Sequence, residues 1–475
     1  MTFLRTPFGR ERLGSWLHGR TRDPLVMNSL YLTATTVVTS LLGYVFWTVA
    51  ARMYPASAIG EAGAGVSAMG FASLVGALGG SMAVLAELPG KRRPRDWSAT
   101  VTAPLVFTSA TSAVTAVATA AVLSQIGHSA FLYRDGWWVA AFVVGVVATT
   151  ASQVLESVWL AERQAIWFLG ASTVFAVVKL AIVVLPVFAV LGATGILSAW
   201  SGVLAATTVG CLLVLVRRFG YRPSLVGLRG RIRSMRQSLA GNYVISVGDQ
   251  VTLYAVPVIV ALKVSPEAAG WFYVAWKIGG FYAVFASAVG TSTFAEGSHR
   301  PDRVLSLAWS GMKMILPFIA VGAAATIFAG RLVLRVFGAQ YSAHSYTLLV
   351  LLSLGAFPDA VVTIYRGVLR VHKRYQTAAA ICWGISISRL AFTALALGWW
   401  GIAGAGWAWL ATQTAGALWC ALDLAVHRGA VQPAAVEAAP IQPTAVQPTA
   451  VQPTAVRATA VRATAEVVTV LKEDS

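Results

Sequence analysis

The sequence has little charge for its length. Only 11% of its 475 residues are charged and 57% are hydrophobic, with a mean hydropathy of +0.70. Soluble globular proteins carry about 25% charged residues. A chain this apolar cannot cover its core with polar surface in water, which excludes soluble enzymes, soluble nucleic-acid-binding domains and disordered chains as descriptions of the whole protein.

Acidic residues, cysteines and catalytic motifs are also scarce. There are 18 Asp and Glu against 36 Lys and Arg, and the three cysteines, Cys211, Cys382 and Cys420, lack the CxxC spacing of a metal site. No P-loop is present, because Arg92 follows the Gly90–Lys91 pair. The sequence also has no DxD pair for a nucleotide-sugar and no histidine-partnered nucleophile. We therefore expect neither an enzyme nor a cofactor, apart from a coupling ion.

Long hydrophobic runs are abundant. A transmembrane helix needs about 20 apolar residues, and a bilayer-spanning run of this kind has to be helical. The first run is too long for the core of a signal peptide, about 7–15 residues, so we expect no cleaved signal. Twelve spans are predicted, at 26–51, 59–88, 98–123, 137–161, 165–191, 193–216, 239–262, 267–295, 304–329, 345–370, 375–399 and 402–426.

The basic residues separate into two sets of loops, which explains the net charge of +18 without nucleic acid. One side holds only Arg52, Arg134, Lys263, Arg331 and Arg335. The positive-inside rule then predicts a cytoplasmic-membrane protein with both termini in the cytoplasm, whose basic loops contact anionic lipids. The cytoplasmic set comprises Arg5, Arg10, Arg12, Arg20, Arg22, Lys91, Arg92, Arg93, Arg95, the seven arginines from Arg217 to Arg236, Arg366, Arg370, Lys373 and Arg374.

The spans divide into two halves with the same orientation. About 210 residues separate two similar segments, which match Arg52, Pro55 and Phe71 with Lys263, Pro266 and Phe281. Such a parallel repeat occurs in several transporter folds. The predicted organisation is a basic N-terminal segment (1–25), a first six-helix bundle (26–216), a basic linker (217–238), a second six-helix bundle (239–426) and a repetitive tail (427–475), which we expect to be disordered.

Ionisable residues within the spans mark the candidate site. Each costs about 2.5–3.5 kcal/mol near the bilayer centre, so we expect them to face a wet cavity or one another. Surplus positive charge favours an anion such as phosphate or pyrophosphate. The four cations are Lys179, Lys277, Lys313 and Arg389. For Lys313, snorkelling to the cytoplasmic end is an equal alternative.

Two acids and several polar residues accompany these cations. Asp249 and Asp359 either pair with one of the cations or bind a coupling ion, H⁺ or Na⁺. Residues three, four or seven positions apart share one side of a helix. On this basis the predicted polar lining comprises Asn28, Thr35, Gln153, Glu156, Asn242 and Ser246. For Glu156, packing or capping is the favoured alternative.

The segment from Asn28 to Leu88 resembles the start of the polysaccharide biosynthesis, or oligosaccharide flippase, family. This family belongs to the multidrug, oligosaccharidyl-lipid and polysaccharide (MOP) exporter superfamily. The pattern "aR.y....iG" is carried here by Arg52, Tyr54, Ile59 and Gly60. The resemblance implies an all-α, MATE-like membrane fold with two six-helix bundles around a central, often cationic cavity. It also implies alternating-access flipping of a polyprenyl-diphosphate-linked oligosaccharide, with glycosyltransferases and a glycan polymerase as partners.

We therefore predict a flippase in which the sugar headgroup crosses within the cavity while the lipid tail stays in the bilayer, through a gap between the first and eighth spans. A drug or small-solute antiporter of the same superfamily is the nearest alternative, although a pump for cations needs surplus acids. A major-facilitator transporter is disfavoured because the loop after the second span, "LPGKRRPRDW", lacks an Asp-Arg core. A non-transporting scaffold for glycan assembly is the remaining alternative.

Overall fold

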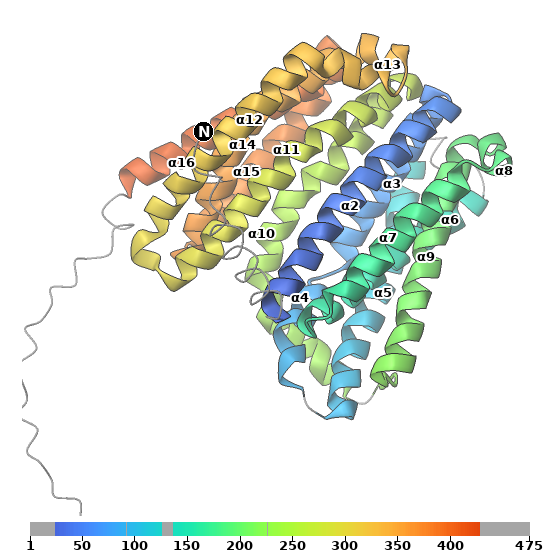
Figure 1. Cartoon of the computed structure of the whole chain (residues 1–475), viewed down its shortest axis with the longest axis vertical. Helices are drawn as coiled ribbons and strands as arrows, with labels where there is room; N and C mark the ends of the chain where they lie inside the picture. Colours follow the sequence, from blue (N-terminus) through green and yellow to red (C-terminus); the bar gives the residue numbers. More distant parts are fainter. Residues whose placement is uncertain (1–23, 92, 126–135, 226, 428–475) are drawn as a thin grey trace, which may run out of the picture. The chain divides into compact units, whose positions relative to one another are not determined.

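The computed structural model describes residues 24–91, 93–125, 136–225 and 227–427, and the regular structure in these ranges is helical (Figure 1). The predicted N-terminal segment (1–25) and repetitive tail (427–475) lie almost entirely outside the described residues. Elements that position the candidate site fall in two groups, which match the two predicted halves of the chain.

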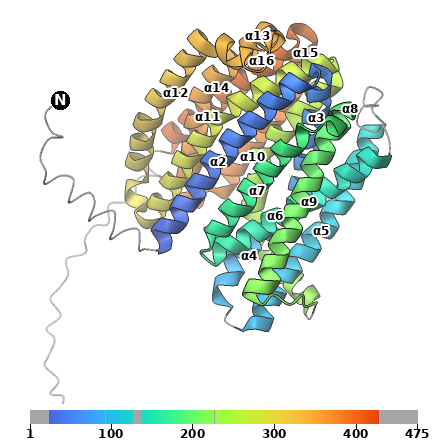
Figure 2. The same ribbon diagram turned by 45° about the vertical axis from the view of Figure 1, so that its right-hand side comes forward.

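The first half forms a helical bundle, whose members are α2 (Pro24–Met53), α3 (Ala56–Gly76), α4 (Gly80–Glu87), α5 (Pro94–Ser124), α6 (Gly136–Ala161), α7 (Ala165–Val183), α8 (Pro186–Val190) and α9 (Gly192–Phe219). A short 3₁₀ turn, η1 (Leu88–Gly90), follows α4. α2 packs along α7, and α6 packs against α5 and α9 (Figures 1 and 2). Their Ala, Val and Leu side chains fill the core while each helix satisfies its own backbone hydrogen bonds.

The second half forms a second bundle, whose members are α10 (Leu228–Lys263), α11 (Pro266–His299), α12 (Val304–Arg335), α13 (Ala339–His344), α14 (Tyr346–Val371), α15 (Tyr375–Trp400) and α16 (Ile402–Val426). The 3₁₀ turn η3 (Pro301–Arg303) precedes α12. α14 packs against α11, α12 and α16, and α15 packs against α10 and α16. α14 therefore lies in the middle of this bundle, so polar side chains on it are drawn into the interior.

Eleven described helices are long and apolar enough to cross a membrane, one fewer than the twelve predicted spans. The remaining helix, α16, has the predicted bounds and a span's length, but Trp407, Trp409, Thr412 and Gln413 lower its hydropathy. The protein is therefore a multi-pass membrane protein.

The second predicted span, 59–88, is wrong as a single helix. α3 ends at Gly76 and α4 begins at Gly80, because Leu78 (φ 40°) and Gly79 (φ 76°) adopt left-handed backbone conformations between them. Left-handed residues stop helices, and glycine adopts this conformation without a steric penalty. The residues of this turn are as apolar as the helices on either side, so hydropathy alone does not reveal the break.

Two further boundaries also need correction. The predicted linker 217–238 shrinks to 220–227, because α9 continues to Phe219 and α10 already begins at Leu228. The residues after Leu228 include Arg, Leu, Met and Gln, which favour helix. The predicted span 165–191 likewise ends at Val183, and Pro186 opens the separate helix α8.

The turns between helices support the predicted parallel repeat. Arg163, between α6 and α7, and Lys373, between α14 and α15, both have left-handed backbones, with φ of 56° and 57°. Gly192 and Gly401 form a second such pair, at 58° and 53°. Each pair stands at the separation that the repeat predicts. Non-glycine residues rarely adopt positive φ, so the same exception at matching turns favours a common origin of the two halves.

The two bundles meet mainly where α3 packs against α10 and α11. A Cβ atom added to Gly60 of α3 would clash with the carbonyl oxygen of Pro266, and one added to Gly270 of α11 would clash with that of Ala56. The two glycines therefore set the separation of α3 and α11, as is common between membrane helices. Near this crossing, a hydrogen bond also joins the two halves, in which Arg52 Nε donates to the carbonyl oxygen of Val336, 2.8 Å away.

We expect Gly60→Ala to lower the midpoint of thermal unfolding in detergent. Alanine is the better helix former by about 1 kcal/mol, but the added methyl group meets backbone that cannot move aside, and overpacking costs about 1–3 kcal/mol. Gly398→Ala on α15 is the matched control, since a Cβ there has nothing within 4 Å, and should be neutral or stabilising. Equal midpoints for the two variants would show that α3 and α11 do not need this close approach.

Candidate functional site

Two of the predicted cations line one cavity between the bundles. This interbundle cavity has a volume of about 420 Å³ and contains Lys179 of α7 and Lys277 of α11. Its wall on α2 is formed by Thr39, Ser40, Gly43, Tyr44 and Trp47. The first and eighth predicted spans correspond to α2 and α11, and residues of both helices line this cavity.

Lys179 is buried within a cage of aromatic rings. Its side chain is 3% exposed, and its ammonium nitrogen lies 3.7 Å from the ring centre of Trp200, 4.4 Å from that of Phe175 and 4.5 Å from that of Phe46. A desolvated cation–π contact contributes about 2 kcal/mol. The cage therefore stabilises the charge without neutralising it.

Lys277 reaches into the same cavity and remains accessible there. Its ammonium nitrogen lies 5.1 Å from the ring centre of Tyr273. Among the described residues, no carboxylate forms an ion pair with Lys277 or Lys179. Both positive charges are thus available to an anion that enters the cavity.

A second cavity, of about 380 Å³, lies within the second bundle and shares no lining residue with the first. We refer to it as the second-bundle cavity. The charged residues that line it are Asp249, Asp359, Arg366, Arg370 and Arg389, and Ser246 lies on the same wall. It therefore brings together both predicted acids and one of the four predicted cations.

Asp249 is held by two arginines of α14. It forms an ion pair with Arg366, and a second with Arg370 at 3.7 Å. The thiol of Cys382 donates to the same carboxylate at 3.3 Å. Of the two alternatives for Asp249, pairing with a cation is the one observed, although its partners are not among the four cations selected from the sequence.

Asp359 and Arg389 have neutral partners. The Asp359 carboxylate accepts a hydrogen bond from the side-chain amide of Gln413. Arg389, only 4% exposed, donates to Thr252 at 3.1 Å and Thr412 at 3.3 Å. Its guanidinium carbon lies 4.0 Å from the ring centre of Trp409.

The structure does not bring Lys313 to either cavity. Its side chain is exposed on α12, and its ammonium nitrogen lies 5.6 Å from the ring of Trp309. The Lys-to-Trp spacing of four residues places both on one face of the helix. Lys313 therefore lines neither the interbundle nor the second-bundle cavity, and snorkelling to the cytoplasmic end stays a prediction.

The residues of the predicted polar lining do not share one cavity. Asn28 Oδ1 accepts from the backbone N–H of Ala165 at 3.0 Å, and Thr35 donates to the carbonyl of Tyr31 at 2.7 Å. Glu156 lines a separate cavity of about 200 Å³ inside the first bundle, while Gln153, on the same helix, lines none of the cavities described. The side chain of Asn242 lies outside the described residues.

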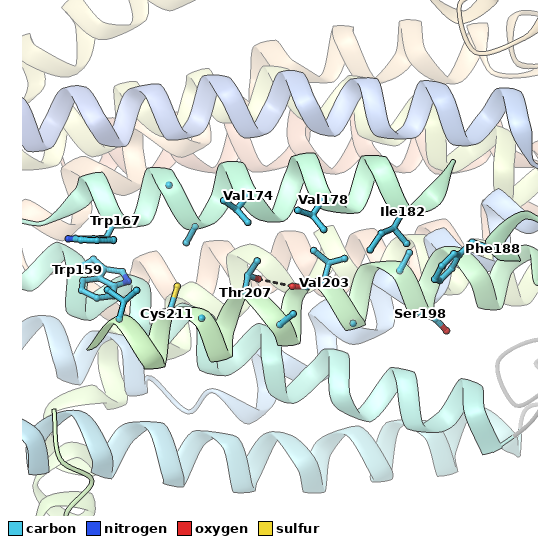
Figure 3. A pocket seen from close by; sticks show the side chains of 17 residues that line it. Trp159, Trp167, Val174, Val178, Ile182, Phe188, Ser198, Val203, Thr207 and Cys211 are labelled. Atoms are coloured by element: carbon cyan, nitrogen blue, oxygen red, sulfur yellow. Dashed lines mark hydrogen bonds between the residues drawn. The ribbon is translucent and has the colours of Figure 1, made fainter. Parts of the chain in front are cut away.

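A long apolar groove runs between α7 and α9, with a volume of about 670 Å³ (Figure 3). Val174, Val178 and Ile182 of α7 face Val203 and Thr207 of α9 across it. The Thr207 hydroxyl is already used, because it donates to the carbonyl of Val203 at 2.9 Å. The lining of the groove is mostly apolar and contains no charged residue, so the groove is not a site for a charged group.

The sequence alone did not place Arg366, Arg370 or Gln413 in a site. Arg366 and Arg370 belong to the predicted cytoplasmic set, because they lie near the end of a span. Their spacing from Asp359, at seven and eleven residues, was the available signal, since these positions share a helix face. Within the aromatic cage of Lys179, only Phe175 had a sequence signal, because it lies four residues before Lys179 on α7. Phe46 and Trp200 belong to α2 and α9, so their place in the cage follows from packing alone.

No protein-family profile and no curated protein matches the sequence. Solved structures match its fold. Lipid II flippase MurJ, in an inward closed conformation, aligns with a TM-score of 0.65 and 12% identity over 83% of this chain and 87% of that one. An inward-facing multidrug resistance MATE family transporter of the MOP superfamily aligns with a TM-score of 0.58 and 15% identity over 85% and 96%.

A MOP superfamily transporter from Pyrococcus furiosus Vc1, described as having a binding pocket of reverse polarity, aligns with a TM-score of 0.57 and 13% identity, over 86% of this chain and 97% of that one. At such identities the likeness concerns the fold. The predicted all-α, MATE-like architecture is therefore confirmed, and it is the fold of MOP superfamily transporters and flippases.

We expect Asp249→Asn and Arg366→Gln each to lower the free energy of unfolding by about 1.5–3 kcal/mol, because each removes the closest charged partner from a partly buried ion pair. The double variant should lose less than the two single losses together, since neither charge is then left alone. Denaturant titration of the four proteins in micelles measures this coupling.

The matched control is the exposed pair of Arg300 and Glu296, whose charged atoms lie 3.9 Å apart. Exposed ion pairs contribute about 0–1 kcal/mol, so Arg300→Gln should change stability little. Strictly additive losses at Asp249 and Arg366 would show that the two residues do not act as a pair.

Proposed function

We propose that this protein is a flippase that moves a polyprenyl-diphosphate-linked oligosaccharide across the cytoplasmic membrane by alternating access. The observation that carries the proposal is the interbundle cavity, in which Lys179 and Lys277 face a common space without an acidic partner among the described residues. A diphosphate is the anionic group of such a substrate, and two ammonium groups that line one cavity attract it strongly.

The lining of the cavity suits a headgroup that is both charged and hydroxylated. Hydroxyl groups of Ser40 and Tyr44 lie on the α2 wall, where sugar hydroxyls can exchange hydrogen bonds with them. The partners of the Lys179 ammonium group are aromatic rings and not a counter-ion among the described residues. A carboxylate in the same position would have cancelled the attraction for phosphate.

The lipid tail can remain in the bilayer during transport. The cavity lies between α2 and α11, and Val284, at its edge on α11, is 42% exposed. An apolar chain that leaves the cavity at this edge stays in an apolar medium, so only the headgroup needs a polar path.

The basic loops support the proposed orientation in the membrane and the proposed cytoplasmic partners. Lys91, Arg93 and Arg95 lie together between α4 and the first turn of α5, and the positive-inside rule puts such clusters in the cytoplasm with both termini. Glycan precursors of this type are made by cytoplasmic glycosyltransferases, so these enzymes and a glycan polymerase are the partners that we propose.

We propose Asp359 as the group that couples transport to H⁺ or Na⁺. It is buried, and its described partner is the neutral amide of Gln413. Asp249, in contrast, is already engaged by two arginines. A buried carboxylate with a neutral partner changes its surroundings most when a proton or cation binds to it.

The alternatives make different demands on the cavity. A drug antiporter for cations requires acidic groups there, and the interbundle cavity is lined by two lysines instead. A scaffold for glycan assembly requires no transport at all. Both differ from the flippase in the same assay, because neither moves a lipid-linked diphosphate between leaflets.

We expect Lys179→Gln and Lys277→Gln each to slow the flipping of a fluorescent polyprenyl-diphosphate oligosaccharide in proteoliposomes by about tenfold or more, since a charge-assisted contact contributes about 1.5–3 kcal/mol. Lys313→Gln is the matched control: it removes the same charge from an exposed position outside the cavity and should leave the rate unchanged. Equal rates for all three variants and the wild type would contradict the cationic-cavity mechanism.

We also expect Asp359→Asn to uncouple transport. The amide cannot take up a proton, so flipping in proteoliposomes should lose its response to an imposed H⁺ or Na⁺ gradient while movement down the substrate gradient persists. Asp302→Asn, in the exposed turn η3, is the control and should keep the response. A full gradient response in Asp359→Asn would rule out its coupling role.

A further inference from the structure

The second-bundle cavity carries more positive than negative charge. Three arginines and two aspartates line it, and among the described residues no other charged side chain does. Asp249 is shared by Arg366 and Arg370. Because one carboxylate cannot neutralise two guanidinium groups, this part of the cavity keeps a net positive charge.

Arg389 has no described carboxylate at ion-pair distance, and with Asp359 in the same lining the cavity has one surplus positive charge. Its polar contacts are two threonine hydroxyls, and its guanidinium stacks on the ring of Trp409. The side chain is more than nine-tenths buried. A buried cation with neutral partners only is stabilised further by any anion that reaches it.

Several N–H donors in this cavity have no acceptor. Arg366 Nε, Arg370 Nε and Arg389 Nη2 are buried and lack a hydrogen-bond partner. All three belong to side chains that line the same space. Buried donors are normally satisfied, and an unmatched set of guanidinium donors is typical of a site whose ligand supplies the acceptor oxygens.

We propose that the second-bundle cavity binds a phosphate-type oxyanion. Guanidinium groups match tetrahedral oxyanions better than ammonium groups do, because their planar donors can engage two oxygens at once. The anion fits beside the Asp249 ion pair and takes its hydrogen bonds from Arg389 and Arg370. This site goes beyond the flippase proposal, which rests on the lysines of the other cavity.

A bound oxyanion would connect helices that otherwise touch little. Arg366 and Arg370 belong to α14 and Arg389 belongs to α15, and these two helices make few direct contacts. Both pack against a third helix, α16. The anion therefore acts as a cross-link inside the second bundle, and its chemistry is shared by two sources: free phosphate and the diphosphate of a prenyl lipid.

The proposal is tested with the full-length chain in detergent and radiolabelled inorganic phosphate, by equilibrium dialysis. We expect saturable binding in the wild type. Arg389→Gln should weaken it about tenfold or more. Lys313→Gln, which removes an exposed cation that lines neither cavity, is the matched control and should bind as the wild type does.

Two further measurements keep the test decisive. If Arg389→Gln does not fold, Arg370→Gln replaces it, because this partly exposed arginine can be removed while the Arg366–Asp249 pair remains. The proposal is overturned if the wild type does not bind phosphate, or if Lys179→Gln abolishes binding and Arg389→Gln does not. The second outcome would place the anion in the interbundle cavity.

Farnesyl diphosphate distinguishes the two sources of the oxyanion. Competition between farnesyl diphosphate and phosphate, removed by Arg389→Gln, assigns the site to the headgroup of a prenyl lipid. Simultaneous binding of both assigns it to a free anion. Either result supports an oxyanion site, and neither depends on the flipping assay, so failure of this inference is distinguishable from failure of the proposed function.

Discussion

A positive charge inside an apolar helical bundle needs a partner, and the arrangement of this protein's interior follows from that constraint. Lys179 is accommodated by three aromatic rings, Arg366 by a carboxylate, and Arg389 by hydroxyl groups and an indole ring. These partners differ in their effect on the net charge of the site. Rings and hydroxyl groups preserve the net charge of the site, whereas a carboxylate cancels it, so the choice of partner decides where an anion is attracted.

The long helices were predictable because a helix that is surrounded by lipid or protein needs an apolar surface, which hydropathy measures. The bounds of α16 were predicted as found, and those of α15 within one residue. The break at Leu78 and Gly79 was missed, because a left-handed turn between two apolar helices hardly changes composition. The start of α10 at Leu228 was missed because a basic helix outside the apolar span looks like a loop to the same method.

The sequence predicts the position of each site residue along its helix, but not the face of the helix on which the residue lies. Lys179, Lys277 and Lys313 all lie within spans, but depth along a helix does not reveal which face a residue occupies when the whole surface is apolar. Lys313 lies on an exposed face of α12, while the first two share a cavity. The partners of the buried charges, such as Trp200 and Gln413, belong to other helices, so their role emerges only from packing.

The contact of Arg52 with the carbonyl oxygens of Arg335 and Val336 ties the end of α2 to the end of α12. Both acceptors are peptide groups, which do not gain or lose protons over the physiological range. The acceptor side of this contact is therefore indifferent to acidity. Arg52, Arg335 and Val336 line neither the interbundle cavity nor the second-bundle cavity, so the contact joins the two bundles without using the ionisable residues of either one.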